Sequence, residues 1–150
     1  MQKRLFCTFW IAEHLFGVDI LDVKEINQDI RFTPIFHAPK VVKGYVNIRG
    51  RLHLILDQRL LLGIDIRPVQ ESSRLILFKP EVADPFGILV DRVGDVVEVD
   101  VSQIETPPEA SPEGGDGAEW HSSNLSAGVC KLEDGLLVIL NSRNLLKNIW

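Results

Sequence analysis

Residues 45–56 of this chain have the sequence Tyr45-Val46-Asn47-Ile48-Arg49-Gly50-Arg51-Leu52-His53-Leu54-Ile55-Leu56. Two strand-like runs, 45–48 and 52–56, are rich in branched and aromatic residues and flank a short polar segment. Such runs on either side of a glycine-containing turn are typical of paired antiparallel strands, since Gly50 can adopt the positive φ of a tight turn. This stretch is the clearest hairpin in the sequence, and it predicts a fold built from β-strands.

Segments of the same character lie on both sides of this hairpin. Residues 5–27 contain two β-type runs that flank Glu13-His14, which predicts a second hairpin. Short strands that follow one another closely favour a barrel or sandwich, whereas a parallel α/β fold needs helical crossovers of about a dozen residues. We therefore predict an all-β protein. After the polar joint at residues 70–73, the further strand-like runs are 74–78, 86–90, 93–99, 128–131 and 136–140.

Two segments depart from the strand pattern. Residues 142–149 predict a short C-terminal helix with Asn141 or Ser142 as its cap, because these side chains accept hydrogen bonds from the first helical N–H groups. The stretch 105–120 is rich in proline, glycine and acidic residues and predicts a mobile acidic surface loop. The apolar residues of the helix that we expect to face inward are Leu145, Leu146 and Ile149.

Length and composition indicate one folded domain over residues 1–150. Hydrophobic residues make up 45% and charged residues 25% of the chain, which is ordinary globular composition. The net charge of -5 gives no overall attraction for nucleic acid. No apolar run approaches the roughly 18 residues of a spanning helix, so we expect a cytoplasmic protein without membrane insertion.

The residues that most often carry chemistry are scattered. The two cysteines, Cys7 and Cys130, lie in apolar stretches without metal-ligand spacing, so we expect buried free thiols. The histidines form no HExxH pair or Cys/His cluster, so neither a metal site nor a cofactor is predicted. The four histidines are His14, His37, His53 and His121.

Asp57 leaves one alternative open, because a strand followed by an aspartate resembles the phosphorylated end of a strand in a receiver domain. Such domains need a parallel sheet with alternating helices, which the strand pattern does not favour. The carboxylate of Asp57 is interpreted more simply as a structural group near Arg59.

Several motifs together resemble the CheW-like domains of bacterial chemosensory systems. Residues 16–26 (FGVDILDVKEI) are similar to the family opening "YGVDIxxVxEI", and residues 38–50 (APKVVKGYVNIRG) with 54–59 (LILDQR) resemble the pattern that follows it. Residues 86–93 (FGILVDRV) and 134–141 (DGLLVILN) look like the strands of its second half. Leu54 and Gln58 depart from the motif, and the acidic loop is longer than usual.

This resemblance implies two packed five-stranded SH3-like β-barrels. The first is expected at about 15–70 and the second at about 71–140, together with the N-terminal strand. The resemblance also implies a non-catalytic adaptor, not an enzyme, that binds the regulatory domain of a CheA-type histidine kinase and the cytoplasmic tip of a methyl-accepting chemoreceptor. Such an adaptor is expected to be a monomer in isolation and to be recruited to membrane-associated receptor arrays. A CheW-like adaptor of a pilus or gliding pathway is the alternative.

The same resemblance suggests which residues form or support the receptor-binding groove. Arg49 is the foremost candidate, because its place beside a turn glycine should expose its guanidinium for charge-assisted contacts. The glycines could serve only as turn residues, the asparagine could only tie down a loop, and the valine could be plain core. For the kinase contact, we expect exposed apolar strand residues of the first barrel, and the sequence does not single out individual residues. The candidates for the groove are Val23, Glu25, Lys43, Gly44, Asn47, Arg49 and Gly50.

Overall fold

The central hairpin predicted from the sequence is confirmed by the computed structural model, which describes residues 2–28, 30–106, 125–133 and 135–146. Strands β4 (Val42–Ile48) and β5 (Arg51–Asp57) pair in antiparallel fashion around a two-residue turn. Both turn residues have positive φ, 53° at Arg49 and 82° at Gly50, which is the pattern of a type I′ turn. This turn matches the twist of the strands that it joins.

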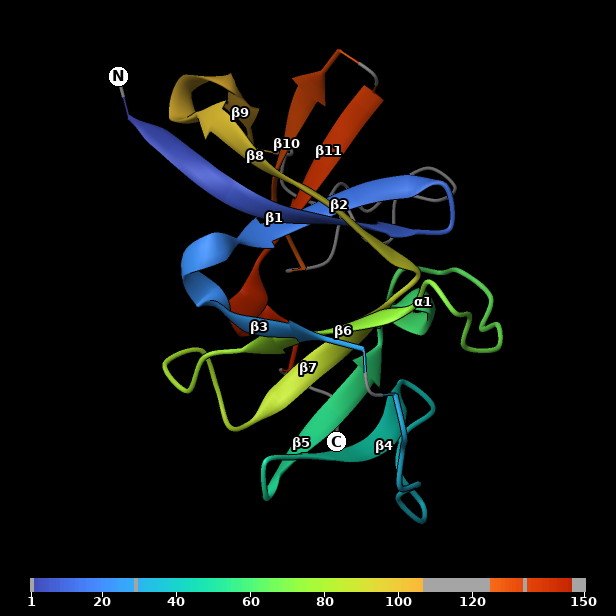
Figure 1. Cartoon of the computed structure of the whole chain (residues 1–150). Helices are drawn as coiled ribbons and strands as arrows, with labels where there is room; N and C mark the ends of the chain where they lie inside the picture. Colours follow the sequence, from blue (N-terminus) through green and yellow to red (C-terminus); the bar gives the residue numbers. More distant parts are fainter. Residues whose placement is uncertain (1, 29, 107–124, 134, 147–150) are drawn as a thin grey trace.

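A five-stranded sheet contains this hairpin and forms the first barrel, in the order β3-β6-β7-β5-β4 (Figure 1). All neighbours in it are antiparallel except β5 and β7, which run parallel. Its remaining strands are β3 (Val23–Asn27), β6 (Arg74–Phe78) and β7 (Phe86–Val90), and the four-residue helix α1 (Gln58–Leu61) follows β5.

A six-stranded sheet forms the second barrel, in the order β8-β1-β2-β11-β10-β9. It includes the predicted N-terminal hairpin, and its one parallel pair is β2 with β11. It has one strand more than expected, because the two-residue strand β9 adds to its edge. Its strands are β1 (Lys3–Ile11), β2 (His14–Asp19), β8 (Arg92–Asp100), β9 (Ile104–Glu105), β10 (Ser126–Leu132) and β11 (Gly135–Leu140).

The strands are distributed between the sheets differently from the predicted division near residue 71. Strands β6 and β7 pair within the first sheet, and β2 pairs within the second. The chain crosses between the sheets through the 3-10 helix η1 (Ile20–Asp22) and again after β7. The physical reason is that strand pairing depends on contacts distant in sequence, which local strand patterns do not specify.

The largest hydrophobic core cluster contains buried side chains from both sheets. Phe9 and Phe16 come from the second barrel, and their rings lie 6.0 Å apart. Phe78 and Phe86 come from the first barrel, with ring centroids 4.8 Å apart. The two barrels therefore share one core, and a smaller cluster lies within each barrel.

After β11 the chain forms the short 3-10 helix η3 (Ser142–Asn144). The predicted cap is confirmed at Asn141, whose Oδ1 accepts a hydrogen bond from the Arg143 amide at 3.1 Å. Leu145 is fully buried, as expected. The rest of the predicted helix, with Ile149, and the predicted acidic loop beyond Thr106 lie outside the described residues. In the part of the chain that is described, no helix is long and apolar enough to cross a membrane.

Candidate functional site

The candidate site centres on a two-pronged ion pair between Glu25 and Arg49. Arg49 Nη1 donates to Glu25 Oε1 at 2.5 Å, and Nη2 donates to Oε2 at 2.9 Å. Glu25 lies on β3 and Arg49 in the β4–β5 turn, and β3 and β4 are the two edge strands of the first sheet. The ion pair therefore joins opposite edges of the sheet where it closes into a barrel.

The two partners of this ion pair differ in exposure. The side chain of Arg49 is 70% exposed, whereas that of Glu25 is 21% exposed. The hydrogen bond from Arg49 lowers the pKa of the Glu25 carboxyl, and the same bond raises the pKa of the guanidinium. Each partner thus favours the charged form of the other, and a fixed cation faces solvent on the first barrel.

Asn47 and Gly50 hold the turn that carries Arg49. Asn47 Oδ1 accepts a hydrogen bond from the Gly50 amide at 2.9 Å. A Cβ at Gly50 would contact nothing within 4 Å, so only its φ of 82° favours glycine there. These two residues match the structural interpretation made from the sequence, and they determine where Arg49 lies.

Gly44 is required for close backbone packing rather than for a turn. A Cβ there would lie 2.4 Å from the carbonyl oxygen of Thr33, and its φ is +143°. Thr33 exchanges backbone hydrogen bonds of 2.8 and 2.9 Å with Tyr45, so the preceding loop is fastened to β4 at this point. Gly44 therefore allows the loop that contains Thr33 to pack against β4.

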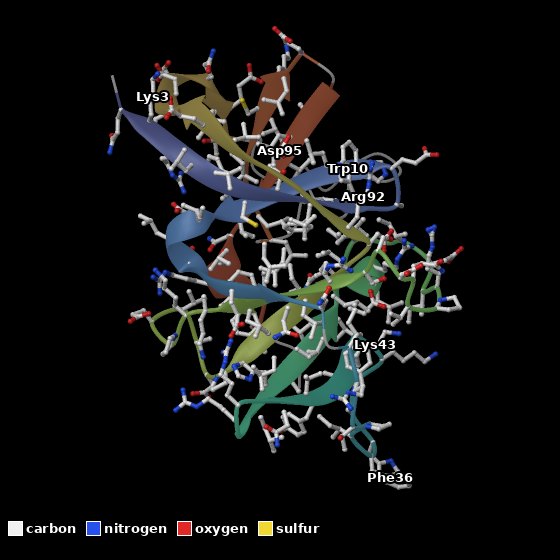
Figure 2. All side chains as sticks on the ribbon, in the orientation of Figure 1. Lys3, Trp10, Phe36, Lys43, Arg92 and Asp95 are labelled. Atoms are coloured by element: carbon white, nitrogen blue, oxygen red, sulfur yellow. The ribbon has the colours of Figure 1, made fainter. Side chains whose placement is uncertain are left out.

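Lys43 lies on β4 (Figure 2), and its ion-pair partner is a buried carboxylate rather than Glu25. Its Nζ lies 3.4 Å from Oδ2 of Asp57, which is 1% exposed. The other oxygen of Asp57 caps α1 by accepting a hydrogen bond from the Arg59 amide at 3.0 Å. Asp57 is thus a structural group, and the receiver-domain alternative is wrong, because the fold lacks a parallel sheet with alternating helices in all the described ranges.

Val23 is the remaining candidate from the sequence. It is partly buried, packs against the core cluster shared by the barrels, and pairs with Phe78 of β6. Its position matches the core interpretation. Of the seven candidates, the structure thus brings together Glu25, Arg49, Asn47 and Gly50, while the other three support the barrel around them.

Sequence reasoning missed the partner of Arg59. The guanidinium of this buried residue forms an ion pair with Asp91, the residue between β7 and β8. The same carboxylate accepts a hydrogen bond from the Ala12 amide at 2.7 Å, in the β1–β2 turn. Arg59 lies in the motif at 54–59 and Asp91 in the motif at 86–93, so both residues were visible in the sequence. Because 32 residues separate them in the chain, the sequence did not indicate that they form a pair.

Burial shifts the pKa of three titratable groups, Cys7, Cys130 and His53. Burial raises the pKa of the Cys7 and Cys130 thiols, which disfavours the reactive thiolate. Burial also lowers the pKa of His53, whose Nδ1 lies 3.1 Å from the Arg51 carbonyl oxygen. Among the described residues, no group of three or more potential ligands could hold a metal ion.

The known proteins that this chain resembles in sequence and in structure include several CheW proteins. The chain is 25% identical to the chemotaxis protein CheW of Helicobacter pylori over 95% of this chain and 81% of that protein. It is 28% identical to the chemotaxis protein CheW of Klebsiella aerogenes, with the same coverage. The crystal structure of the scaffolding protein TtCheW from Thermoanaerobacter tengcongensis matches with a TM-score of 0.79 at 28% identity, covering 93% of this chain and 90% of that one.

The structural match confirms the predicted architecture of two packed SH3-like β-barrels. The family model described as "CheW-like domain" matches residues 5–149, which include both barrels and every candidate residue. The chain therefore belongs to the family of CheW-like domains.

Proposed function

We propose that this chain is a non-catalytic adaptor that couples chemoreceptors to a CheA-type histidine kinase. The observation that carries the proposal is the CheW-like match over residues 5–149. Its relatives bear the name chemotaxis protein, and a solved homologue is titled a scaffolding protein. An adaptor works by binding two partners at once, so it requires two surfaces and no reacting group or cofactor. It would act in the cytoplasm at receptor arrays and be a monomer in isolation.

The surface around Arg49 is the proposed receptor contact. An arginine has five N–H donors, and the pair with Glu25 uses two of them, so three remain for a partner. Because Glu25 and the Asn47–Gly50 hydrogen bond already fix the guanidinium, little side-chain freedom is lost on binding. A receptor tip is a helical hairpin, and such helices bind by apolar contacts with a few charged guides.

The other candidates would act by supporting this surface. Gly44 allows the loop at Thr33 to pack against β4, and Lys43 neutralises the buried Asp57. Val23 anchors β3 in the core. Substitutions at these positions are therefore expected to affect receptor binding through folding rather than through lost contacts.

The proposed kinase contact uses the exposed apolar strand residues of the first barrel. Leu52 on β5 is 55% exposed and lines a cavity of about 570 Å³ with Tyr45 and Pro85. Ile26 on β3 is 44% exposed. Large apolar side chains of this kind form the desolvated centre of protein interfaces.

The test is co-sedimentation with receptor-containing membranes and a CheA-type kinase, comparing the parent protein with Arg49→Ala. Arg51→Ala is a matched control, because Arg51 is an exposed arginine of the same hairpin. The parent and the control are expected to join the complex and raise kinase activity, and Arg49→Ala is expected to bind receptor poorly while remaining folded. A folded parent that binds neither receptor nor kinase would rule out the coupling function.

A pilus pathway is the second candidate, because the chain is 30% identical to Protein PilI of Pseudomonas aeruginosa over 103 residues. That match covers 67% of this chain and 57% of PilI. The same assay with the kinase of a chemotaxis system and the kinase of a pilus system distinguishes the two. Activation of the pilus kinase alone would favour this second candidate.

A further inference from the structure

The second barrel contains a cavity that the proposed function does not use. It has a volume of about 570 Å³ and lies between the β1–β2 hairpin, β8 and the β10–β11 turn. We call it the second-barrel pocket. Its volume lies in the usual range of ligand sites. Trp10, Leu15, Val97 and Leu136 supply much of its apolar lining.

Three carboxylates also line the second-barrel pocket, and each comes from a different part of the barrel. Glu13 lies in the β1–β2 turn, Asp95 on β8 and Glu133 in the β10–β11 turn, and all three residues are exposed. None of them forms an ion pair with another residue in the described ranges, whereas other acids of the same barrel do, as in Lys3–Glu98. Of the described residues in the lining, His14 is the one basic residue. The pocket therefore combines an apolar floor with three carboxylates that have no ion-pair partner among the described residues.

A guanidinium contacts one of the lining residues, Trp10. Arg92 lies opposite Trp10 in the β1–β8 pairing, and its guanidinium stacks over the indole ring at 4.7 Å. Figure 2 shows this pair on neighbouring strands, with Asp95 further along β8. Arg92 thus lies on an aromatic face beside the pocket and forms no ion pair with the three carboxylates in the described part of the chain.

We propose that the second-barrel pocket binds a segment of a partner protein that presents an arginine beside an apolar side chain. The carboxylates would pair with the guanidinium, and the apolar floor would cover its aliphatic stem and the neighbouring residue. A protein segment fits better than a small cation, because β8 lies at the edge of its sheet, with β1 as its one neighbour among the described strands, and an edge strand offers main-chain groups to an extended chain. The second-barrel pocket and Arg49 lie on different barrels. Binding at the pocket therefore does not require that the chain couples a receptor.

The test uses a defined probe, the peptide acetyl-Val-Leu-Arg-Val-amide, added to the isotope-labelled full chain and followed by amide NMR shifts. The amides of Thr8, Gly94 and Gly135 and the indole of Trp10 report on the pocket. The same peptide with citrulline in place of arginine keeps the shape and removes the charge. We expect the arginine peptide to shift the pocket signals and the citrulline peptide to bind about fivefold more weakly.

Variants then assign the effect to the pocket. Asp95→Asn combined with Glu133→Gln should weaken the arginine peptide by a similar factor. Glu71→Gln removes a charge from an exposed glutamate outside the pocket and should leave binding unchanged.

Four results would each overturn the proposal. The first is no shift of the pocket signals, and the second is equal binding of the arginine and citrulline peptides. The third is equal binding of free arginine amide and the arginine peptide, because this would indicate a site for a small cation. The fourth is a shift of the same signals when the protein alone is concentrated, which would indicate a second copy of this chain as the occupant.

Discussion

The network of Arg59, Asp91 and the Ala12 amide joins the two barrels, and removing one of its charges should destabilise the fold. Arg59 follows β5 of the first barrel, and Ala12 lies in the β1–β2 turn of the second. Asp91 lies between them, where the chain crosses from one barrel to the other. The side chain of Arg59 is 8% exposed and that of Asp91 is 22% exposed.

The magnitude follows from this burial. Removing one member of a buried ion pair leaves an uncompensated charge and costs about 3–5 kcal/mol. Asp91 is partly exposed, and Arg59 keeps a 2.9 Å hydrogen bond to the Asp65 carbonyl. We therefore expect Asp91→Asn to lower the free energy of unfolding by an amount near the lower end of this range. A loss of about 3 kcal/mol lowers the melting temperature of a domain of this size by roughly 6–12 °C. This loss is also a large share of the free energy of unfolding of a typical protein, which is about 5–15 kcal/mol.

The assay is urea unfolding of the parent, Arg59→Met, Asp91→Asn and the double variant. In the double variant no unpaired charge is buried, so its free energy of unfolding should exceed the additive expectation by roughly 1–3 kcal/mol. Arg67→Met is the control. Arg67 lies 3.9 Å from the same carboxylate but is 47% exposed, so it should change stability by less than about 1 kcal/mol.

Strict additivity of the two single variants would refute this reasoning. Losses in both single variants no larger than that of the Arg67 control would refute it too, because the network would then contribute no more than a surface pair.

Three further predictions concern the hairpin and the thiols. Gly44→Ala should lower the free energy of unfolding by about 1–3 kcal/mol in urea titration, because its φ and the facing loop backbone leave no room for a Cβ; an unchanged midpoint would contradict this. The Glu25 carboxyl should titrate by NMR below its ordinary pKa, and Arg49→Ala should move its midpoint up towards the ordinary value of a glutamate, because the bond from Arg49 is the main cause of the lowered pKa. Because the pKa of Glu25 is lowered in the folded state, the ion pair stabilises the fold fully at pH values above the pKa of Glu25 in the unfolded chain, and this stabilisation is lost as the pH falls through its pKa in the folded protein. A Glu25 midpoint that does not move in Arg49→Ala would argue against the ion pair. Cys7 and Cys130 should react slowly with a thiol reagent in the folded protein and rapidly in urea, and equal rates would show that they are not buried.

The local chain chemistry determined the elements of this protein. The β4–β5 hairpin was predictable, because a short turn with glycine between two branched runs is specified within a dozen residues. Asn141 as the cap of η3 was predictable for the same reason. The seven site candidates came from the resemblance to a family, and the structural roles suggested for Val23, Asn47 and Gly50 agree with their contacts.

Only the tertiary structure decided how these elements pair. The parallel contacts of β5 with β7 and of β2 with β11 join strands about 30 and 120 residues apart, and alternation along a strand carries no information about its neighbour. The same holds for Arg49, whose partner Glu25 lies 24 residues away, and for Arg59 with Asp91. The three carboxylates line one pocket only because two turns and an edge strand meet in space. A sequence specifies local backbone preferences residue by residue, whereas these sites depend on which distant strands the shared core brings together.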